Sequence, residues 1–568
     1  MPRIATAALP RLAGSLISSS SSSVSAPAIR AFSIAAASAA TRSNQNSAAA
    51  TTAAARIPTS LRALSTSAVA MGGHGGEGVG EDNARPPYDQ VVQDIADVSL
   101  TYFWVRASLS YEITSEVAYN TARLCLLDSL GCAVEALHFP QAVSVLGPVV
   151  PGTTVPNGAR VIGTNHVLDP IRAAFNNGAL IRWLDFNDTW LAAEWGHPSD
   201  NLGSIISVAD WLSRTAVANG KKPLTVQDIL TAAIQAHEIQ GNLAIENSFN
   251  RVGLDHVLLV KVASAAVVSK MIGNSRDQTV DVISQAFVDG QSLRTYRHAP
   301  NASSRKSWAA GDACSRAVNL ALLVQKGQPG LPSVLTAKVW GFYDVLFKGK
   351  EFAFQRPYTS YVMENVLFKL VPAEFHAQTA CEAAILAHAE MAKVGKTSDD
   401  IEKVKLLTQE AAVRIISKAG ALHNYADRDH SLQYMVAVSL MNGKLTPDMY
   451  NDDYAANPKI DELRAKMEVK EEGRYTKEYM EPEKRSIGNS VEIVFKDGST
   501  IGPIALDYPV GHARRREEAI PLIAKKLRKH LEGHFDQARE SKIMSLIEDH
   551  KALTAMPVPE FVDLWLKA

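Results

Sequence analysis

From about residue 91 to residue 325 the sequence repeats one helix pattern after another, which restricts this region to an all-helical domain. Asp169 followed by Pro170 is a strong helix start, because aspartate caps free backbone amides and proline suits the first turn. The segments 262–273 and 313–324 are rich in small residues. We therefore expect helices that approach one another closely.

The pattern changes after about residue 369. Residues 404–408 and 491–495 have the composition and alternation of strands, and Asp497-Gly498 after the second is a hairpin turn signal. Apolar helix patterns lie between the two strands. This mixture predicts a smaller α+β unit.

A chain of 568 residues is longer than a single hydrophobic core usually supports. We predict a mainly α fold, with a large all-helical domain over residues 86–365 and a smaller α+β lid domain over residues 366–512. Helical patterns over residues 513–568 are predicted to return to the helical domain.

Residues 1–76 differ in composition from the rest of the chain. They contain six arginines and long serine and alanine tracts, and the first acidic residue is Glu77. This composition is typical of an organellar transit peptide, although a plain disordered tail has the same features.

The overall charge excludes some classes of function. The formal net charge is -1, which gives no indication of a nucleic-acid or membrane-surface protein. No apolar run reaches the length of a membrane-spanning helix. The four cysteines are too few and too scattered for a disulfide framework, so we expect buried free thiols.

Asp185 is the first candidate catalytic residue. The apolar stripe of the helix that starts at Pro170 places it on the core-facing side, near the helix C-terminus. Burial and the helix dipole are both expected to raise its pKa toward that of a general base. The alternative is that Asp185 only caps the helix or pairs with a neighbouring cation.

His197 follows in the turn His-Pro-Ser-Asp-Asn, directly before another apolar helix. Ser199 or Asn201 is expected to cap that helix. A histidine beside a helix N-terminus suits an anionic substrate, and Trp190 and Trp195 favour a pocket there. A purely structural histidine is the alternative.

A basic segment gives the second group of candidates. Arg294, Arg297, His298, Arg305 and Lys306 lie close together in a loop that leads into a helix. Arginine offers paired hydrogen bonds to carboxylates and lysine a point charge, so the segment suits anion binding. A solvated basic loop is the alternative.

Several common catalytic and metal motifs are absent. The sequence contains no serine elbow, phosphate-binding glycine loop, dinucleotide fingerprint or zinc-type Cys/His set. Asp185, His197 and His256 match no known ligand spacing, so we expect no metal and no cofactor.

Long motifs distributed over the chain resemble the MmgE/PrpD family, whose members include 2-methylcitrate dehydratase and cis-aconitate decarboxylase. The motifs are DFNDTWLAAEWGHPSDN, HEIQGNLAIENSFNRVGLDHVLLVKVAS, RTYRHAPNASSRKSWAAGDA, NVLFKLVPAEFHAQ, HSLQYM, EPEKRSIGNSVEIVFKDG and YPVGHARRREEAIPL. The stretch before His197 and the alanine at position 309 resemble the dehydratase branch, because the decarboxylases tend to have a shorter motif and a histidine at these places.

The resemblance implies a homodimer that acts on a small tricarboxylate in the mitochondrial matrix without an iron–sulfur cluster. It implies the elimination of water from 2-methylcitrate in the methylcitrate cycle of propionate catabolism. A decarboxylase that forms itaconate from cis-aconitate is the alternative within the family. A non-catalytic helical binding protein is the alternative from another class.

The resemblance also assigns roles to residues. Those expected to be catalytic are Asp185, His197, Lys306 and Tyr434. Those expected to bind the substrate are Thr189, His256 and Lys369, and the basic segment adds Arg297 and Arg305 to them. A base removes a proton next to a carboxylate, cations stabilise the charge that develops there, and a protonated group helps hydroxide to leave. The sequence leaves open which residue is the base and which is the acid.

Overall fold

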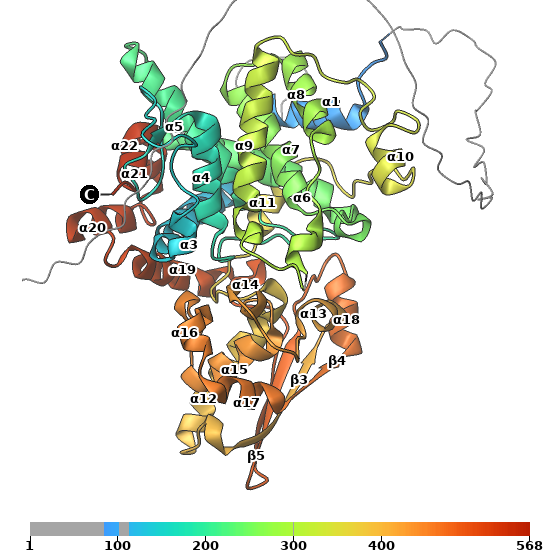
Figure 1. The fold of residues 1–568 in the computed structure, drawn as a ribbon, viewed down its shortest axis with the longest axis vertical. Helices are drawn as coiled ribbons and strands as arrows, with labels where there is room; N and C mark the ends of the chain where they lie inside the picture. The colour runs from blue at the N-terminus through green and yellow to red at the C-terminus, as the bar shows by residue number, and fades with distance from the viewer. Residues whose placement is uncertain (1–84, 101–112, 299, 568) are drawn as a thin grey trace, which may run out of the picture. The chain divides into compact units, whose positions relative to one another are not determined.

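The computed structural model describes residues 85–100, 113–298 and 300–567, so the predicted transit segment, residues 1–76, lies outside the described residues. Helices dominate the part of the chain before residue 366 (Figure 1). Their bounds are α1 (Gln90–Leu100), α2 (Glu116–Glu135), α3 (Pro140–Val143), α4 (Pro170–Arg182), α5 (Leu202–Ala218), α6 (Val226–Glu246), α7 (Val257–Met271), α8 (Arg276–Val288), α9 (Arg305–Gln325), α10 (Phe342–Phe347) and α11 (Tyr361–Asn365). Two short strands, β1 (Ala159–Arg160) and β2 (Val167–Leu168), form an antiparallel pair.

The second part combines helices with a sheet. Its helices are α12 (Gln378–Lys393), α13 (Glu410–Ile416), α14 (Tyr425–Arg428), α15 (Leu432–Asn442), α16 (Asp452–Ala455), α17 (Pro458–Ala465) and α18 (Gly473–Met480). Its strands are β3 (Ile401–Thr408), β4 (Met467–Glu471), β5 (Asn489–Phe495) and β6 (Thr500–Leu506). The chain ends with α19 (Arg516–Leu531), α20 (Gln537–Ser545), α21 (His550–Ala555) and α22 (Val558–Asp563).

The sheet has the strand order β4-β3-β5-β6. β3 and β4 are parallel, whereas β5 is antiparallel to both β3 and β6. The predicted hairpin at Asp497-Gly498 connects β5 to β6, with Gly498 in the left-handed conformation that this turn requires. Val404 and Ile493 lie opposite each other and are buried, so this face belongs to the hydrophobic core that α12 and α15 share.

The buried apolar residues form two main clusters. One contains side chains from residues 92–368 together with others from residues 519–565. The other contains side chains from residues 373–495. Lys526 of α19 anchors the C-terminal helices, because its ammonium group contacts Asp128 of α2 at 2.8 Å and donates to the carbonyl of Lys369 at 3.0 Å. The predicted fold class, mainly α with a smaller α+β part, is confirmed.

Glycines outside the predicted small-residue segments allow α4, α5 and α9 to pack closely. A Cβ atom on Gly178 of α4 would lie 2.8 Å from the Cα of Gly311 on α9. A Cβ on Gly203 of α5 would lie 2.5 Å from the Cα of Gly178. These neighbours are backbone atoms that cannot move aside individually, so this three-helix contact requires glycine. The contact fixes the helices that carry Arg182 and Lys306.

We expect Gly311→Ala to lower the free energy of unfolding by about 1–3 kcal/mol, because the added methyl group overpacks the α4–α9 contact. The measurement is urea unfolding followed by circular dichroism. Gly473→Ala at the start of α18 is the matched control, since a Cβ there meets no atom within 4 Å. Equal stability of the two variants would contradict this account.

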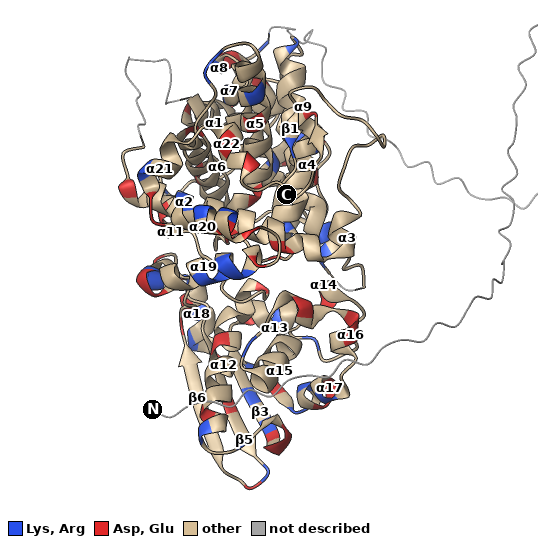
Figure 2. Ribbon diagram, turned by 90° about the vertical axis from the view of Figure 1, so that its left-hand side faces the viewer, with Lys and Arg blue, Asp and Glu red and all other residues tan. Residues whose placement is uncertain are grey.

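Figure 2 shows basic and acidic residues spread over both parts of the described chain. No helix among the described residues is long and apolar enough to cross a membrane.

Candidate active site

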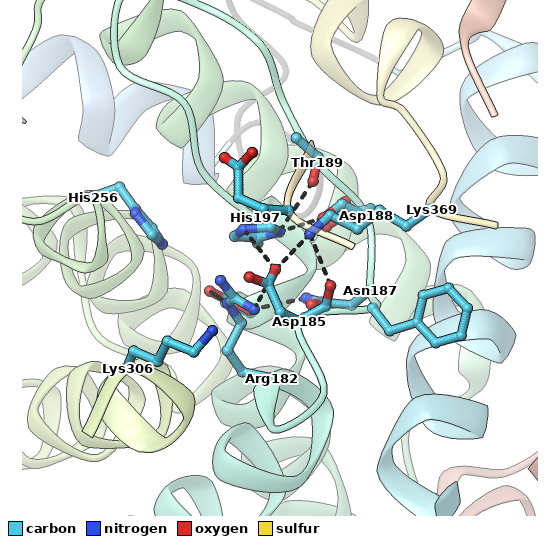
Figure 3. A network of polar contacts seen from close by, with 12 residues as sticks. Arg182, Asp185, Asn187, Asp188, Thr189, His197, His256, Lys306 and Lys369 are labelled. Atoms are coloured by element: carbon cyan, nitrogen blue, oxygen red, sulfur yellow. Dashed lines mark hydrogen bonds and ion pairs between the residues drawn. The ribbon is translucent and has the colours of Figure 1, made fainter. Parts of the chain in front are cut away.

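The site is built on the loop that follows α4 (Figure 3). The helix ends at Arg182, earlier than predicted, and Asp185 has a left-handed backbone with a φ of 51°. Such a conformation persists in an aspartate only where surrounding contacts hold it. The carboxylate of Asp188 supplies one such contact by accepting a hydrogen bond from the Ser199 amide at 3.0 Å. The loop is therefore folded back on itself.

Two cations and two imidazoles approach the buried Asp185 carboxylate. Its Oδ1 lies 2.7 Å from Nη1 of Arg182 and 2.5 Å from Nζ of Lys369. The His197 Nε2 lies 3.5 Å away. Burial by itself raises the pKa of Asp185, but the charges of Arg182, Lys369 and Lys306 outweigh it and hold the pKa well below its ordinary value. The predicted rise in pKa is wrong, and Asp185 is an ionised carboxylate rather than a poised base.

His197 has the geometry of a general base. Its Nδ1 lies 2.6 Å from the carbonyl oxygen of Asp188, which only accepts hydrogen bonds, so Nδ1 carries the proton. The Nε2 atom therefore offers a free lone pair toward the pocket. Burial, followed by the charges of Arg182 and Lys369, lowers the pKa of His197 well below the ordinary value of 6.5, so the imidazole is neutral near physiological pH.

Neither predicted cap supports the helix after His197. Residues 198–201 form a short 3-10 turn, and α5 begins at Leu202 without a side-chain cap. Ser199 donates instead to Asp188 at 2.6 Å, and Asn201 donates to Gln240 at 2.7 Å. These side chains hold the loop rather than the helix terminus.

Asp188 connects the loop to a second buried histidine. His237 of α6 places Nε2 2.9 Å from Asp188 Oδ2, while its Nδ1 lies 2.8 Å from the carbonyl of Ala233. Cys125 of α2 donates to the same carboxylate at 3.4 Å. Asp188 also supplies the carbonyl that orients His197. The network around Asp188 therefore holds the His197 ring on the side away from Nε2.

Lys306 connects α9 to the second part of the chain. Its ammonium group contacts the Asp429 oxygens at 2.7 Å and 2.6 Å, and His430 Nδ1 at 3.1 Å. The His430 ring turns its Nε2 toward Asp185, 3.9 Å from Oδ2. Burial lowers the pKa of Lys306 despite the attraction of Asp429.

Two arginines, Arg294 and Arg297, also line the pocket. Arg297 donates to both oxygens of Asp255, through Nη2 at 3.0 Å and through Nε. Although burial opposes it, this pairing keeps the pKa of Asp255 far below and that of Arg297 above the ordinary values. Arg294 lies 3.8 Å from Glu194 and stacks over Trp195 at 5.1 Å. Both arginines therefore stay charged beside the pocket.

His256 is buried, and its Nδ1 lies 3.6 Å from Asp255 Oδ1, too far for a hydrogen bond. Neither ring nitrogen has a hydrogen bond among the described residues. Its ring centroid lies 5.5 Å from that of His197. A buried imidazole that lines a pocket without a hydrogen bond is available to a ligand.

These residues surround one pocket of about 470 Å³, part of which is open to solvent. Thr189 and Glu374 are part of its lining. The cations and imidazoles that line it are Arg182, Arg294, Arg297, Lys369, His197, His256, His298 and His430. This excess of positive groups around two acidic side chains suits a small polyanion with several carboxylates.

The chain matches the family model of the MmgE/PrpD N-terminal domain over residues 104–355 and that of the MmgE/PrpD C-terminal domain over residues 371–550. The chain belongs to the MmgE/PrpD family. The resemblance seen in the sequence is thereby confirmed.

Relatives in this family carry one recurrent name. The chain is 62% identical over 488 residues to "2-methylcitrate dehydratase, mitochondrial" of Yarrowia lipolytica, covering 86% of this chain and 92% of that protein. It is 58% identical over 487 residues to the 2-methylcitrate dehydratase of Salmonella typhimurium, covering 86% and 99%. It is 56% identical over 494 residues to the "Probable 2-methylcitrate dehydratase" of Saccharomyces cerevisiae, covering 85% and 94%.

Most of the residues that the MmgE/PrpD resemblance singled out meet in the pocket. Asp185, Thr189, His197, His256, Arg297 and Lys369 line it, and Lys306 lies beside it. Lys369 is almost completely buried.

Tyr434 and Arg305 lie elsewhere, which corrects two predicted assignments. The Tyr434 hydroxyl donates to the carbonyl of Met449 at 2.7 Å, and its ring stacks on Tyr450 inside the second core. Arg305 pairs with Asp312 at 3.1 Å. Adjacent residues on a helix point about 100° apart, so Arg305 faces away when Lys306 faces the site.

Sequence reasoning missed Arg182 and the Asp429–His430 pair as members of this MmgE/PrpD site. Arg182 precedes Asp185 by three residues, and that spacing on one helix face was a usable signal. His430 stood in a recognised motif, but nothing near it in the sequence indicated that its ring faces Asp185. That contact joins residues 245 positions apart.

Two groups among the described residues bring three potential metal-ligand atoms together, and neither suits a metal in its present state. In the group of Asp185, Asp429 and His430, the carboxylates already contact Lys369 and Lys306. In the group of Cys125, Asp188 and His237, burial raises the pKa of Cys125 well above its ordinary value, so the sulfur is a thiol and a poor ligand.

Proposed function

We propose that this protein is a hydro-lyase that eliminates water from 2-methylcitrate to give 2-methyl-cis-aconitate. One observation carries the proposal: the neutral His197 points a free Nε2 into a pocket walled by Arg182, Arg297 and Lys369. A base among fixed cations is what proton removal beside a carboxylate requires. The names of the relatives support the choice of substrate.

The chemistry follows from this arrangement. The His197 Nε2 takes the proton from the carbon that bears the methyl group and a carboxylate. The electron pair of that bond moves into the adjacent carboxylate, whose extra charge the cations stabilise, and then forms the carbon–carbon double bond as the hydroxyl leaves. Asp185 keeps Arg182 and Lys369 in place and stays ionised throughout. His256 offers a hydrogen bond to a substrate carboxylate or hydroxyl.

The proposal includes four finer statements. The reaction needs no metal, because the charge of the transition state is met by arginine and lysine side chains. The substrate is a tricarboxylate of the methylcitrate cycle of propionate catabolism. The protein acts as a homodimer in the mitochondrial matrix, in line with the name of the Yarrowia lipolytica relative. Residues 86–365, 366–512 and 513–568 act as helical domain, lid and returning helices.

We expect the chelator-treated protein to convert 2-methylcitrate with a rise in ultraviolet absorbance, because the product contains a carbon–carbon double bond conjugated with carboxylates. Activity should be equal before and after dialysis against a chelator. The same preparation with cis-aconitate is the matched test for decarboxylation, read as released carbon dioxide and itaconate. Absence of the absorbance rise, or conversion of cis-aconitate alone, would reject the proposed function.

A further inference from the structure

Two histidines, one from each of the two parts of the chain, face the Asp185 carboxylate. His197 lies on the loop of the helical part, and its Nε2 is 3.5 Å from Asp185 Oδ1. His430 lies between α14 and α15 of the second part, and its Nε2 is 3.9 Å from Asp185 Oδ2. Both rings line the pocket. A ligand in the pocket is thus flanked by one imidazole from each part of the chain.

The two rings differ in what contacts their other nitrogen. His197 Nδ1 faces the carbonyl of Asp188, a neutral acceptor. His430 Nδ1 lies 2.8 Å from a carboxylate oxygen of Asp429 and 3.1 Å from the Lys306 ammonium group, which pairs with the same carboxylate. A carboxylate stabilises an imidazolium much more than a carbonyl does, because it contributes a full negative charge. Of the two rings, His430 is the one built to hold an additional proton.

Bound substrate favours that proton further. The groups that face His430 are Lys306, Asp429, Asp185, His298 and Glu374. Without substrate, burial and then the Lys306 charge lower the pKa of His430. A ligand with three carboxylates adds negative charge beside the ring, which favours the imidazolium. The charged form is therefore expected to appear when the substrate binds.

We propose that His430 is the general acid of the elimination, protonating the departing hydroxyl while His197 takes the proton from carbon. This inference rests on the proposed function. Asp429 is a positioning residue that acts through His430, and Lys306 holds Asp429 in place through its two contacts with that carboxylate.

The step balances in atoms and charge. The C–H bond breaks and its proton moves to Nε2 of His197, and its electron pair becomes the new carbon–carbon double bond. The C–O bond breaks with its electron pair on oxygen, and the Nε2 proton of His430 converts the leaving group to water. After the product leaves, the His197 imidazolium loses its proton to solvent and the neutral His430 takes one up from solvent, so the catalytic groups return to their starting protonation states while Asp185 stays ionised.

The decisive experiment compares two leaving groups. We expect His430→Asn to lower kcat on 2-methylcitrate at least about a hundredfold, the loss typical of a missing general acid. Asparagine keeps a donor near the Nδ1 position and so preserves the contact with Asp429. With the analogue in which fluorine replaces the tertiary hydroxyl, the variant should come within about threefold of the natural protein, since fluoride leaves without general-acid help of this size. His423→Asn, an exposed histidine of the same part of the chain, is the matched control.

The pH profile gives an independent readout. An acid must be protonated, so activity of the natural protein should fall as the pH rises through the pKa of His430 in the substrate complex. In His430→Asn this alkaline limb should disappear. In Asp429→Asn it should move to lower pH by about 1 unit or more, because the imidazolium loses its carboxylate.

Equal losses on the hydroxyl and fluoro substrates would show a structural role and overturn the inference. An unchanged alkaline limb in both variants would overturn it too. If the natural protein itself does not dehydrate 2-methylcitrate, the proposed function fails instead, so the two failures are distinguishable.

Discussion

Replacing His197 with asparagine should lower kcat for the dehydration at least about a hundredfold, while the fold stays intact. Asparagine places an amide N–H close to the position of Nδ1, so the hydrogen bond to the Asp188 carbonyl survives. What disappears is the Nε2 lone pair that faces the pocket. The measurement is steady-state absorbance of the unsaturated product, with thermal unfolding of the same preparation to check the fold.

The counterpart of this variant is His197→Ala, which leaves space where the ring was. Free imidazole should restore part of the activity of the alanine variant, because the deficit is a missing base rather than a distorted loop. The asparagine variant, whose side chain fills most of that space, should respond less. Activity of His197→Asn near that of the natural protein would exclude His197 as the base.

Local signals made most of the fold predictable. Asp169 and Pro170 begin α4 as expected, with the aspartate accepting from two backbone amides. Residues 404–408 lie inside β3 and residues 491–495 inside β5. Each of these features depends on side chains a few residues apart, which a sequence displays directly. The end of α4 was placed too late, because the left-handed conformation of Asp185 depends on contacts with distant segments.

The electrostatics of the site could not be predicted in the same way. Burial and the helix terminus both indicated a raised pKa for Asp185, and both signals were local. The outcome was decided by Arg182, whose spacing the sequence displayed, and by Lys369, which lies 184 positions further along the chain. The prediction that Tyr434 is catalytic was wrong for a similar reason. Its ring stacks on Tyr450 in the second core, and this packing determines where its hydroxyl points. The pKa values in a pocket of charged residues depend on which residues pair in the folded structure. The sequence shows which charged residues are present but not how they pair.

Removing Lys369 from its pair with Asp185 should lower the stability of the protein measurably. We expect Lys369→Met to lower the free energy of unfolding by about 3 kcal/mol near neutral pH, since it takes one cation from a buried carboxylate that pairs with two. Lys405→Met is the matched control, because Lys405 pairs with Glu492 at a similar distance of 2.8 Å on a partly exposed face, where such a pair contributes about 1 kcal/mol or less. Urea unfolding of both variants measures the difference.

The pH dependence tests the same pair with a definite sign. The folded-state pKa of Asp185 lies below the unfolded value, so its contribution is fully present above about pH 4 and declines as the pH falls through the folded-state value. Lys369→Met raises that folded-state pKa, so the stability gap between variant and natural protein should shrink as the pH falls below about 4. Adding Asp185→Asn to Lys369→Met should cost less than the sum of the two single changes, because the second change removes the carboxylate that the first left short of a cation. A gap that widens in acid, or strictly additive losses, would mean that Asp185 and Lys369 do not stabilise each other, and the ionised carboxylate on which the whole pocket is organised would need another explanation.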